Sequence, residues 1–191
     1  MNSTMDIQAT ATRGRDATEI TSVRSPLVEA NLKTGTKAWG EALRSAALSG
    51  AVSAVATAAW VSLAGARDSG SAVAPVNATG HIAWGPSAGS VEVLSIKHTL
   101  TGAVLHLGAC VFWAALYEKY FGRAAERGEI GKAVLGGGAV AAAAYVTDYH
   151  VVPKRLTPGW EYRLSRRSLA VTYVVLALTL PLRGLLRGPG R

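Results

Sequence analysis

Long uncharged stretches separate the charged residues of this chain. Residues 45–66 form an uncharged run of 22 residues, and residues 99–117 form one of 19. Two shorter runs, residues 133–147 and 168–182, have 15 residues each. A membrane core about 30 Å thick needs roughly 20 helical residues. The first two runs therefore reach the length of a membrane-spanning helix without help.

The two shorter runs reach that length only with their flanking residues. The third run becomes long enough when it continues through Asp148 and His150 to Val152. The fourth depends on long basic side chains, whose aliphatic stems can cross the membrane edge while their charges reach the headgroups. Those residues are Arg166, Arg167 and Arg183.

The pattern predicts an all-α fold, an integral membrane four-helix bundle with spans at about residues 45–66, 98–119, 132–152 and 165–185. A water-soluble bundle would carry charged residues every few positions along each helix, and these runs carry none. Residues 1–40, rich in Thr, Ser and Ala, are predicted to be a disordered cytoplasmic tail ahead of a membrane domain in residues 41–188. Between the first two spans, residues 71–86 are too polar and too short to span, and the stretch bracketed by Pro75 and Gly85 is predicted to form a short interfacial helix anchored by Trp84.

Small residues mark two of the spans as packing helices. The first span has Gly50, Ala54 and Ala58 at four-residue spacing, and the third has three consecutive glycines in residues 136–138. Close approach of small residues drives helix association in lipid. We therefore expect the first and third spans to form the tightly packed centre of the bundle. The same faces could join the protein to itself or to another membrane subunit.

The basic composition fits a membrane protein rather than a nucleic-acid-binding one. The chain carries a formal net charge of +8 and has a pI near 10.0, and its basic residues flank the apolar runs. With both termini in the cytoplasm, 13 Lys and Arg residues lie on the cytoplasmic side and 7 on the other. The positive-inside rule favours this orientation, although the five basic residues between the third and fourth runs oppose it.

One histidine lies within an apolar run. His106 shares a helical face with Cys110, Trp113 and Tyr117, so this face is expected to contact other helices rather than lipid. An ionisable residue within a span is costly and suggests a function. The structural alternative is a neutral imidazole that hydrogen-bonds a neighbouring helix, with Cys110 as a small packing residue. Tyr117 and Glu118 are the other polar residues expected at membrane depth.

A second group of polar residues is expected at one face of the membrane. In a four-span arrangement His81, His98, Asp148 and His150 meet at the same face. Imidazole and carboxylate ligands suit a transition metal, and paired histidines could hold haem. The alternative is that these side chains simply meet water at the interface. The chain has no nucleophile elbow, phosphate-binding loop, zinc-protease motif or dinucleotide fingerprint, so no catalytic residue is assigned and an enzyme is disfavoured.

Several short segments resemble a known group of proteins. Residues 77–85 read NATGHIAWG, residues 97–99 read KHT, residues 112–118 read FWAALYE, and residues 148–159 read DYHVVPKRLTPG. They resemble an uncharacterised group of small bacterial inner-membrane proteins with N-A-x-x-H-x-x-W-G followed by H-T and F-W-x-x-x-Y-E. The group has a pair of adjacent histidines where this chain has His106 and Leu107. The resemblance implies a bacterial inner-membrane location and the number of spans, and it implies no chemistry.

Two functions remain open from the sequence. The first is a non-enzymatic structural or accessory membrane protein, favoured because the spans consist of small residues and carry their carboxylates, Glu118 and Asp148, only at their ends. The second is a metal- or haem-binding membrane protein that uses the histidines gathered at one face.

Overall fold

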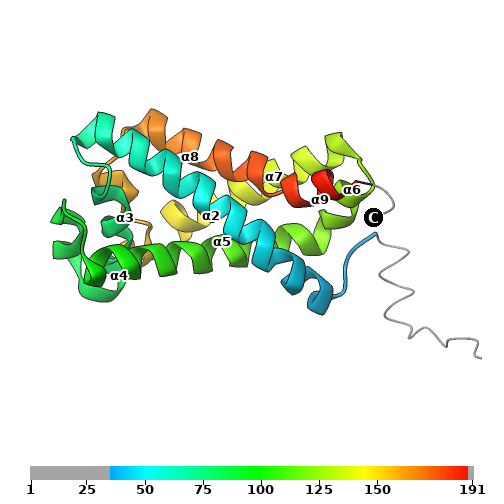
Figure 1. The fold of residues 1–191 in the computed structure, drawn as a ribbon, viewed down its shortest axis with the longest axis horizontal. Coiled ribbons are helices and arrows are strands. Elements are labelled where there is room, and N and C mark those ends of the chain that lie inside the picture. Colours follow the sequence, from blue (N-terminus) through cyan, green and yellow to red (C-terminus); the bar gives the residue numbers. More distant parts are fainter. Residues whose placement is uncertain (1–34, 189–191) are drawn as a thin grey trace, which may run out of the picture.

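Four long helices make up most of the molecule, which is seen in a computed structural model that describes residues 35–188 (Figure 1). They span Trp39–Ser69, Ile96–Tyr120, Ile130–Val151 and Arg166–Arg187. No strand occurs within residues 35–188. The predicted all-α four-helix bundle is therefore confirmed, and each helix contains one of the four uncharged runs and extends beyond both of its ends.

Three of the four long helices consist of more than one helical element. The first is α2 (Trp39–Ser69); the second begins as a π-helical turn, Ile96–Leu100, and continues as α5 (Thr101–Tyr120). The third is α7 (Ile130–Val146), which ends in a π-helical turn, Thr147–Val151, and the fourth comprises α8 (Arg166–Thr179) and α9 (Leu182–Arg187). Shorter helices connect them: α3 (Ala74–Thr79), α4 (His81–Trp84), α6 (Gly122–Glu126) and single turns at Pro86–Ser90, Lys154–Leu156 and Trp160–Tyr162.

A glycine ends α2, and a proline interrupts the fourth long helix. Gly70 closes α2 with a left-handed backbone (φ 76°) and donates its N–H to the carbonyl of Gly65. Such a conformation is favourable for glycine because it has no Cβ. Pro181 separates α8 from α9, since it has no N–H for a helical hydrogen bond.

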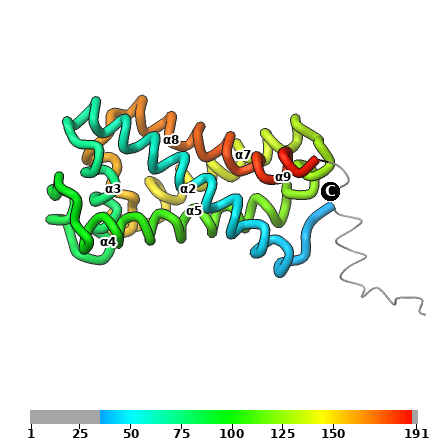
Figure 2. Tube along the Cα trace, viewed as in Figure 1, coloured from blue at the N-terminus to red at the C-terminus, as the bar shows by residue number. Residues whose placement is uncertain are grey.

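The long helices run side by side along the molecule (Figure 2). Helix α2 packs along α5 and α8, whereas α7 packs along α8 and α5. The prediction that the first and third spans pair at the centre is therefore wrong. Gly50 of α2 instead faces α5, where a Cβ on Gly50 would lie 2.6 Å from the Cα atom of Val111. Gly137 of α7 lies against the carbonyl oxygen of Ala177 in α8.

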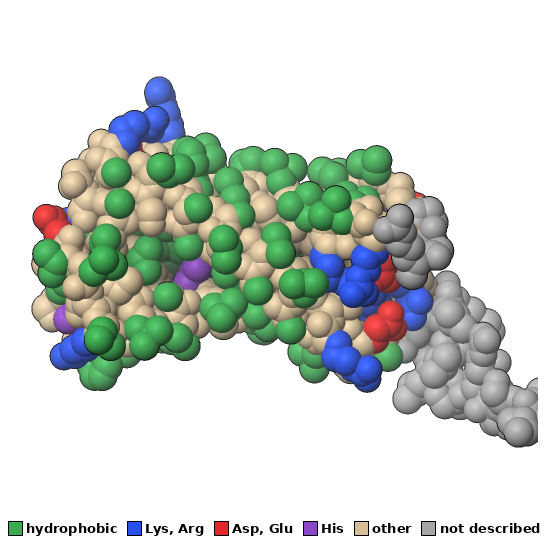
Figure 3. All heavy atoms as spheres, viewed as in Figure 1, with side chains coloured by type: hydrophobic (Ala, Val, Ile, Leu, Met, Phe, Trp, Pro, Cys, Tyr) green, Lys and Arg blue, Asp and Glu red, His purple; other side chains and the backbone are tan. Residues whose placement is uncertain are grey.

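Small side chains fill the centre of the bundle and large apolar ones lie on its surface. The buried core includes alanines from three helices, among them Ala46, Ala54, Ala114, Ala141 and Ala144. Exposed large residues follow the helices along their length, including Leu48, Val55, Leu63, Val104, Phe112, Leu135, Val174 and Leu178. On the face shown in Figure 3, apolar side chains extend over the length of the bundle while charged ones gather toward its ends. This distribution suits lipid rather than water and supports a multi-pass membrane protein.

Polar side chains join the helices across the core. The indole N–H of Trp60 in α2 donates to the carbonyl of Ser168 in α8, at 3.0 Å. The hydroxyl of Thr179 in α8 donates to that of Ser53 in α2, also at 3.0 Å. Asp68, at the end of α2, accepts from the backbone N–H of Ser165 at the start of α8. These contacts fix the pairing of α2 with α8.

The segment between the first two long helices forms helical structure, as expected, but folds inward. Asn77 of α3 is fully buried; its amide donates to the carbonyls of Val91 and Val93, and its carbonyl oxygen accepts from Thr99. Trp84, the expected anchor, is about half exposed. The segment therefore closes one end of the bundle, which we call the loop end.

The predicted tail, residues 1–40, lies outside the described residues up to residue 34. Its last six residues do not extend away from the bundle: Lys37 is fully buried, and Trp39 begins α2. This end of the bundle, which also holds α6 and α9, we call the terminal end (Figure 1).

Candidate functional site

His106 points between α5 and α2. Its Nε2 lies 2.8 Å from the hydroxyl oxygen of Thr57 and 3.2 Å from the carbonyl oxygen of Ala54, both in α2. Its ring also contacts that of Trp160 edge-on, with the ring centroids 5.4 Å apart. The predicted interhelical hydrogen bond of His106 is therefore present in the structure, and its partners are a hydroxyl and a carbonyl.

A small cavity lies beside His106. Its volume is about 130 Å³, and its wall includes Thr57, Cys110, Asp148 and Tyr173. The Tyr173 hydroxyl donates to a carboxylate oxygen of Asp148 at 2.7 Å. Cys110 is buried, with its sulfur 3.7 Å from Nε2 of His106, consistent with the expected packing role. The polar groups named here thus form two sets of contacts, His106 with Thr57 and Cys110, and Tyr173 with Asp148.

The four residues predicted as metal ligands all lie toward the loop end but have separate partners. His81 in α4 contacts the carbonyls of Ala78 and Lys154, at 2.7 and 3.3 Å. His98 lies in the π-helical turn before α5 and contacts the hydroxyl of Ser95. His150 lies in the π-helical turn after α7, where its ring packs against that of Tyr145. Asp148 lies in the same turn.

Within residues 35–188, no three His, Cys, Asp or Glu side chains come together as a metal-binding group. The predicted ligands lie at one end of the bundle, as the topology requires. Their nitrogen and oxygen atoms do not meet at a common point. The alternative, in which these side chains meet water at the interface, fits the exposed His150 but not His81, which is buried against two backbone carbonyls.

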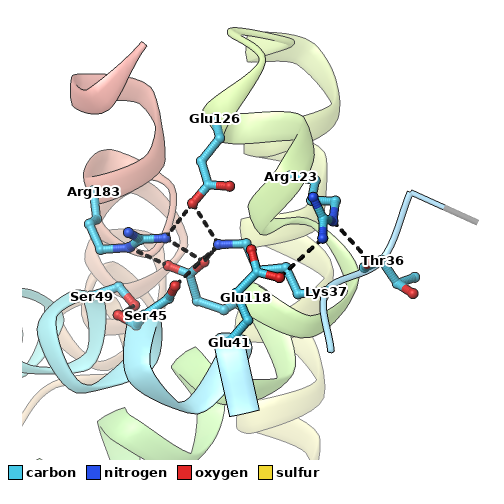
Figure 4. A network of polar contacts seen from close by, with 9 residues as sticks. All are labelled: Thr36, Lys37, Glu41, Ser45, Ser49, Glu118, Arg123, Glu126 and Arg183. Carbon is cyan, nitrogen blue, oxygen red and sulfur yellow. Dashed lines mark hydrogen bonds and ion pairs between the residues drawn. The ribbon is translucent and has the colours of Figure 1, made fainter. Parts of the chain in front are cut away.

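At the terminal end, four charged side chains form a buried cluster, which we call the charged network: Lys37, Glu118, Glu126 and Arg183 (Figure 4). Lys37 Nζ contacts Glu118 at 2.7 Å and Glu126 at 2.6 Å. Arg183 binds both oxygens of Glu118, each at 2.9 Å, and Glu126 at 2.7 Å. Two cations therefore neutralise two carboxylates.

The charged network is almost fully enclosed. The side chains of Lys37, Glu118 and Arg183 are 0, 1 and 4% exposed. Glu126 is partly buried; its burial raises the pKa, but the hydrogen bonds from Lys37 and Arg183 outweigh this and lower the pKa below its ordinary value. Glu126 thus stays ionised at neutral pH, which keeps the cluster balanced.

The charged network also corrects one prediction. Arg183 was expected to reach outward to the headgroups, but its guanidinium turns inward because Glu118 and Glu126 both lie within hydrogen-bonding distance. Beside the network, an outer pair joins Arg123 to Glu41 at 3.0 Å, and the Nε of Arg123 donates to the carbonyl of Thr36 at 2.9 Å (Figure 4). Tyr117, the other polar residue predicted at this depth, is buried and donates to the carbonyl of Ala133.

The surface formed by residues 35–188 has further hollows, and two of them matter for the proposals below. A groove of about 830 Å³, the α7–α8 groove, runs between those helices and is lined at membrane depth mainly by small and apolar residues. A cavity of about 570 Å³ at the loop end, the basic cavity, is lined by Ala78, His81, Pro86, Gly89, Ser90, Lys154, Arg155, Tyr162 and Arg163. Neither hollow was predicted.

The sequence pointed to Glu118 and His106 but not to the residues that contact them. The sequence indicates His106 as a polar position within an apolar run and Glu118 as one at the end of a span, whereas it places Lys37 in the tail and Glu126 between the second and third spans. The only signal in the sequence was the position of oppositely charged residues at adjoining ends of different spans. A comparison of the chain with protein-family models, curated proteins and solved structures finds no match.

Proposed function

We propose that this protein is a non-enzymatic structural or accessory protein of a bacterial inner membrane, which joins a further transmembrane helix along the α7–α8 groove. The further helix belongs either to a second copy of the chain or to another membrane subunit. One observation carries the proposal: a large lateral groove, whose lining includes Gly138, Ala142 and Ala177, lies open on the side of the bundle.

The wall of the groove suits helix packing. Gly138 and Ala142 lie four residues apart on α7, and both are exposed. A Cβ on Gly138 would meet no atom within 4 Å. Across the groove, α8 contributes Ala170, Val174 and Ala177. Small residues at this spacing let helix backbones approach closely, and this approach drives association in lipid.

The internal pairing of charged groups supports a structural role. Each charged side chain of the charged network has partners of opposite sign within the same cluster, and His106 binds Thr57 and Ala54. An ion or proton pathway would need ionisable groups that exchange partners along the membrane normal. The charged network instead joins the chain before α2 to α5, α6 and α9.

The location and orientation rest on the sequence. Three of the four segments that resemble the bacterial inner-membrane group contact one another at the loop end, where Thr99 binds Asn77 and Gly159 lies against the carbonyl of Ala78. The excess of 13 Lys and Arg residues over 7 supports cytoplasmic termini.

Paired substitutions on adjacent residues of α7 test the association. Ala142→Leu would fill the groove and should reduce self-association or recovery of a bound subunit at least severalfold, because the added side chain blocks backbone approach. Association is measured by energy transfer between labelled copies in lipid vesicles and by cross-linking in membranes, followed by identification of the attached chain.

Ala143→Leu is the matched control, because Ala143 is also exposed but does not line the groove. It should leave association unchanged. Equal behaviour of the two variants, or a wild-type protein that is monomeric and unattached in its native membrane, would contradict the proposal.

A further inference from the structure

The loop end carries a cavity whose charged side chains are all basic. Lys154, Arg155 and Arg163 line the basic cavity, together with His81 and Tyr162, and no carboxylate lines it. Its volume of about 570 Å³ falls within the roughly 300–1,000 Å³ of small-ligand sites. The cavity lies between the α3–α4 segment and the chain that connects α7 to α8.

The wall of the basic cavity is held in place by hydrogen bonds. Arg163 donates to the carbonyl of Gly89, with its Nε at 2.7 Å, and binds the carboxylate of Glu92 at 2.8 Å. His81 joins the carbonyls of Ala78 and Lys154, so α4 is tied to the opposite wall. Gly159 supports the same contact, because its left-handed backbone (φ 80°) brings it against Ala78 and His81. The cavity is thus a built feature rather than a gap between mobile loops.

Two of its cations have no counter-charge. Glu92 offsets the charge of Arg163. Lys154 and Arg155 are exposed, and among residues 35–188 neither forms an ion pair or a side-chain hydrogen bond. Two adjacent cations without a carboxylate repel one another, and an anion placed between them removes this cost.

We propose that the basic cavity binds a phosphate-bearing anion through Lys154 and Arg155. A phosphate oxygen can accept from the ammonium of Lys154 and from the planar guanidinium of Arg155. The phosphate belongs either to a phospholipid headgroup at the membrane surface or to a soluble phosphate compound. Trp84 and Tyr162, both exposed at this end, are the aromatic residues typical of headgroup depth.

A charge-matched pair of double variants tests the site in the full chain. Lys154→Gln with Arg155→Gln removes the two free cations of the cavity. Arg166→Gln with Arg167→Gln removes the same charge from two exposed residues that do not line it. All four residues are exposed, so both proteins should fold, which is checked by their elution profiles and thermal unfolding.

Two arms separate the sources of the phosphate. In the first, inorganic phosphate is titrated into protein in a non-ionic detergent, and the rise in unfolding temperature is measured. In the second, the protein is reconstituted with phosphatidylcholine alone or mixed with phosphatidylglycerol, and the retained lipid is measured by native mass spectrometry. The Lys154/Arg155 variant should bind at least about tenfold more weakly in the responding arm, since hydrogen bonds to charged groups contribute about that factor or more each.

The arms give distinct results. A response to inorganic phosphate alone identifies a soluble ligand, selective retention of phosphatidylglycerol identifies a lipid headgroup, and both together identify recognition of the phosphate group itself. No response in either arm, or an equal loss in the Arg166/Arg167 control, would overturn the proposal.

Discussion

At the scale of single residues, the hydrogen bonds of His106 determine its tautomer. The Thr57 hydroxyl donates to the carbonyl of Ser53, at 2.6 Å, so its oxygen is left as an acceptor for the imidazole. The second neighbour of Nε2, the carbonyl of Ala54, can only accept. Nε2 of His106 therefore carries the hydrogen. The imidazole acts as a donor from α5 to α2, which is a structural use of a polar residue within the membrane.

This geometry predicts different effects for two substitutions of His106. His106→Gln can place an amide N–H near Thr57 and should keep most of the stability. His106→Leu removes the donor and should lower the free energy of unfolding by about 0.6 to 2 kcal/mol, the size of interhelical hydrogen bonds in membranes. Both are measured by unfolding in mixed detergent micelles, with Thr57→Val completing a double-mutant cycle. If leucine and glutamine cost the same, or the cycle shows no coupling, the hydrogen bond does not stabilise the bundle.

At the scale of elements, the charged network decides how the terminal end closes. Lys37 precedes α2, Glu118 lies in the last turns of α5, Glu126 ends α6 and Arg183 lies in α9. Each of these segments carries one charge of the cluster. Because the charges are buried, none can be removed without leaving a buried partner of opposite sign unmatched.

We expect Glu118→Gln to destabilise the protein strongly. It leaves Lys37 and Arg183 facing one carboxylate, and loss of one partner of a buried ion pair costs roughly 3–5 kcal/mol. Glu41→Gln is the matched control, because the Glu41–Arg123 pair is partly exposed and should contribute at most about 1 kcal/mol. Both are measured by unfolding in the same detergent. Similar losses in the two variants would show that the charged network does not hold the terminal end together.

At the scale of the whole molecule, the antiparallel helices place residues 90 and 160 at one end and residues 125 and 188 at the other. Within the described residues the two ends carry similar numbers of basic residues. The chain before Gly35 supplies much of the excess that favours cytoplasmic termini. Reporter fusions at residue 90, residue 125, residue 160 and the C-terminus should therefore report outside, inside, outside and inside.

The fusion at residue 160 is the critical one. Residue 160 lies within the loop between the third and fourth spans, and the five basic residues of this loop oppose the expected orientation. A report of inside at residues 90 and 160, with outside at residue 125, would show that this loop determines an inverted orientation. A report of inside at residue 160, with outside at residue 90 and inside at residue 125, would show that the third apolar run does not cross the membrane.

The sequence by itself determined the number and approximate bounds of the helices, because uncharged runs of membrane length have few alternatives to a helix in lipid. It also identified His106, Tyr117 and Glu118 as polar positions at membrane depth. It did not determine which helices pack together: Gly50 could have faced any neighbour, and only the tertiary structure places it on Val111 of α5. The charged network, the α7–α8 groove and the basic cavity likewise join segments far apart in the chain, such as Lys37 with Glu118 and His81 with Lys154. Periodicity along one helix reports the face that a residue occupies, whereas its partner depends on the arrangement of all four helices, which no single run of residues encodes.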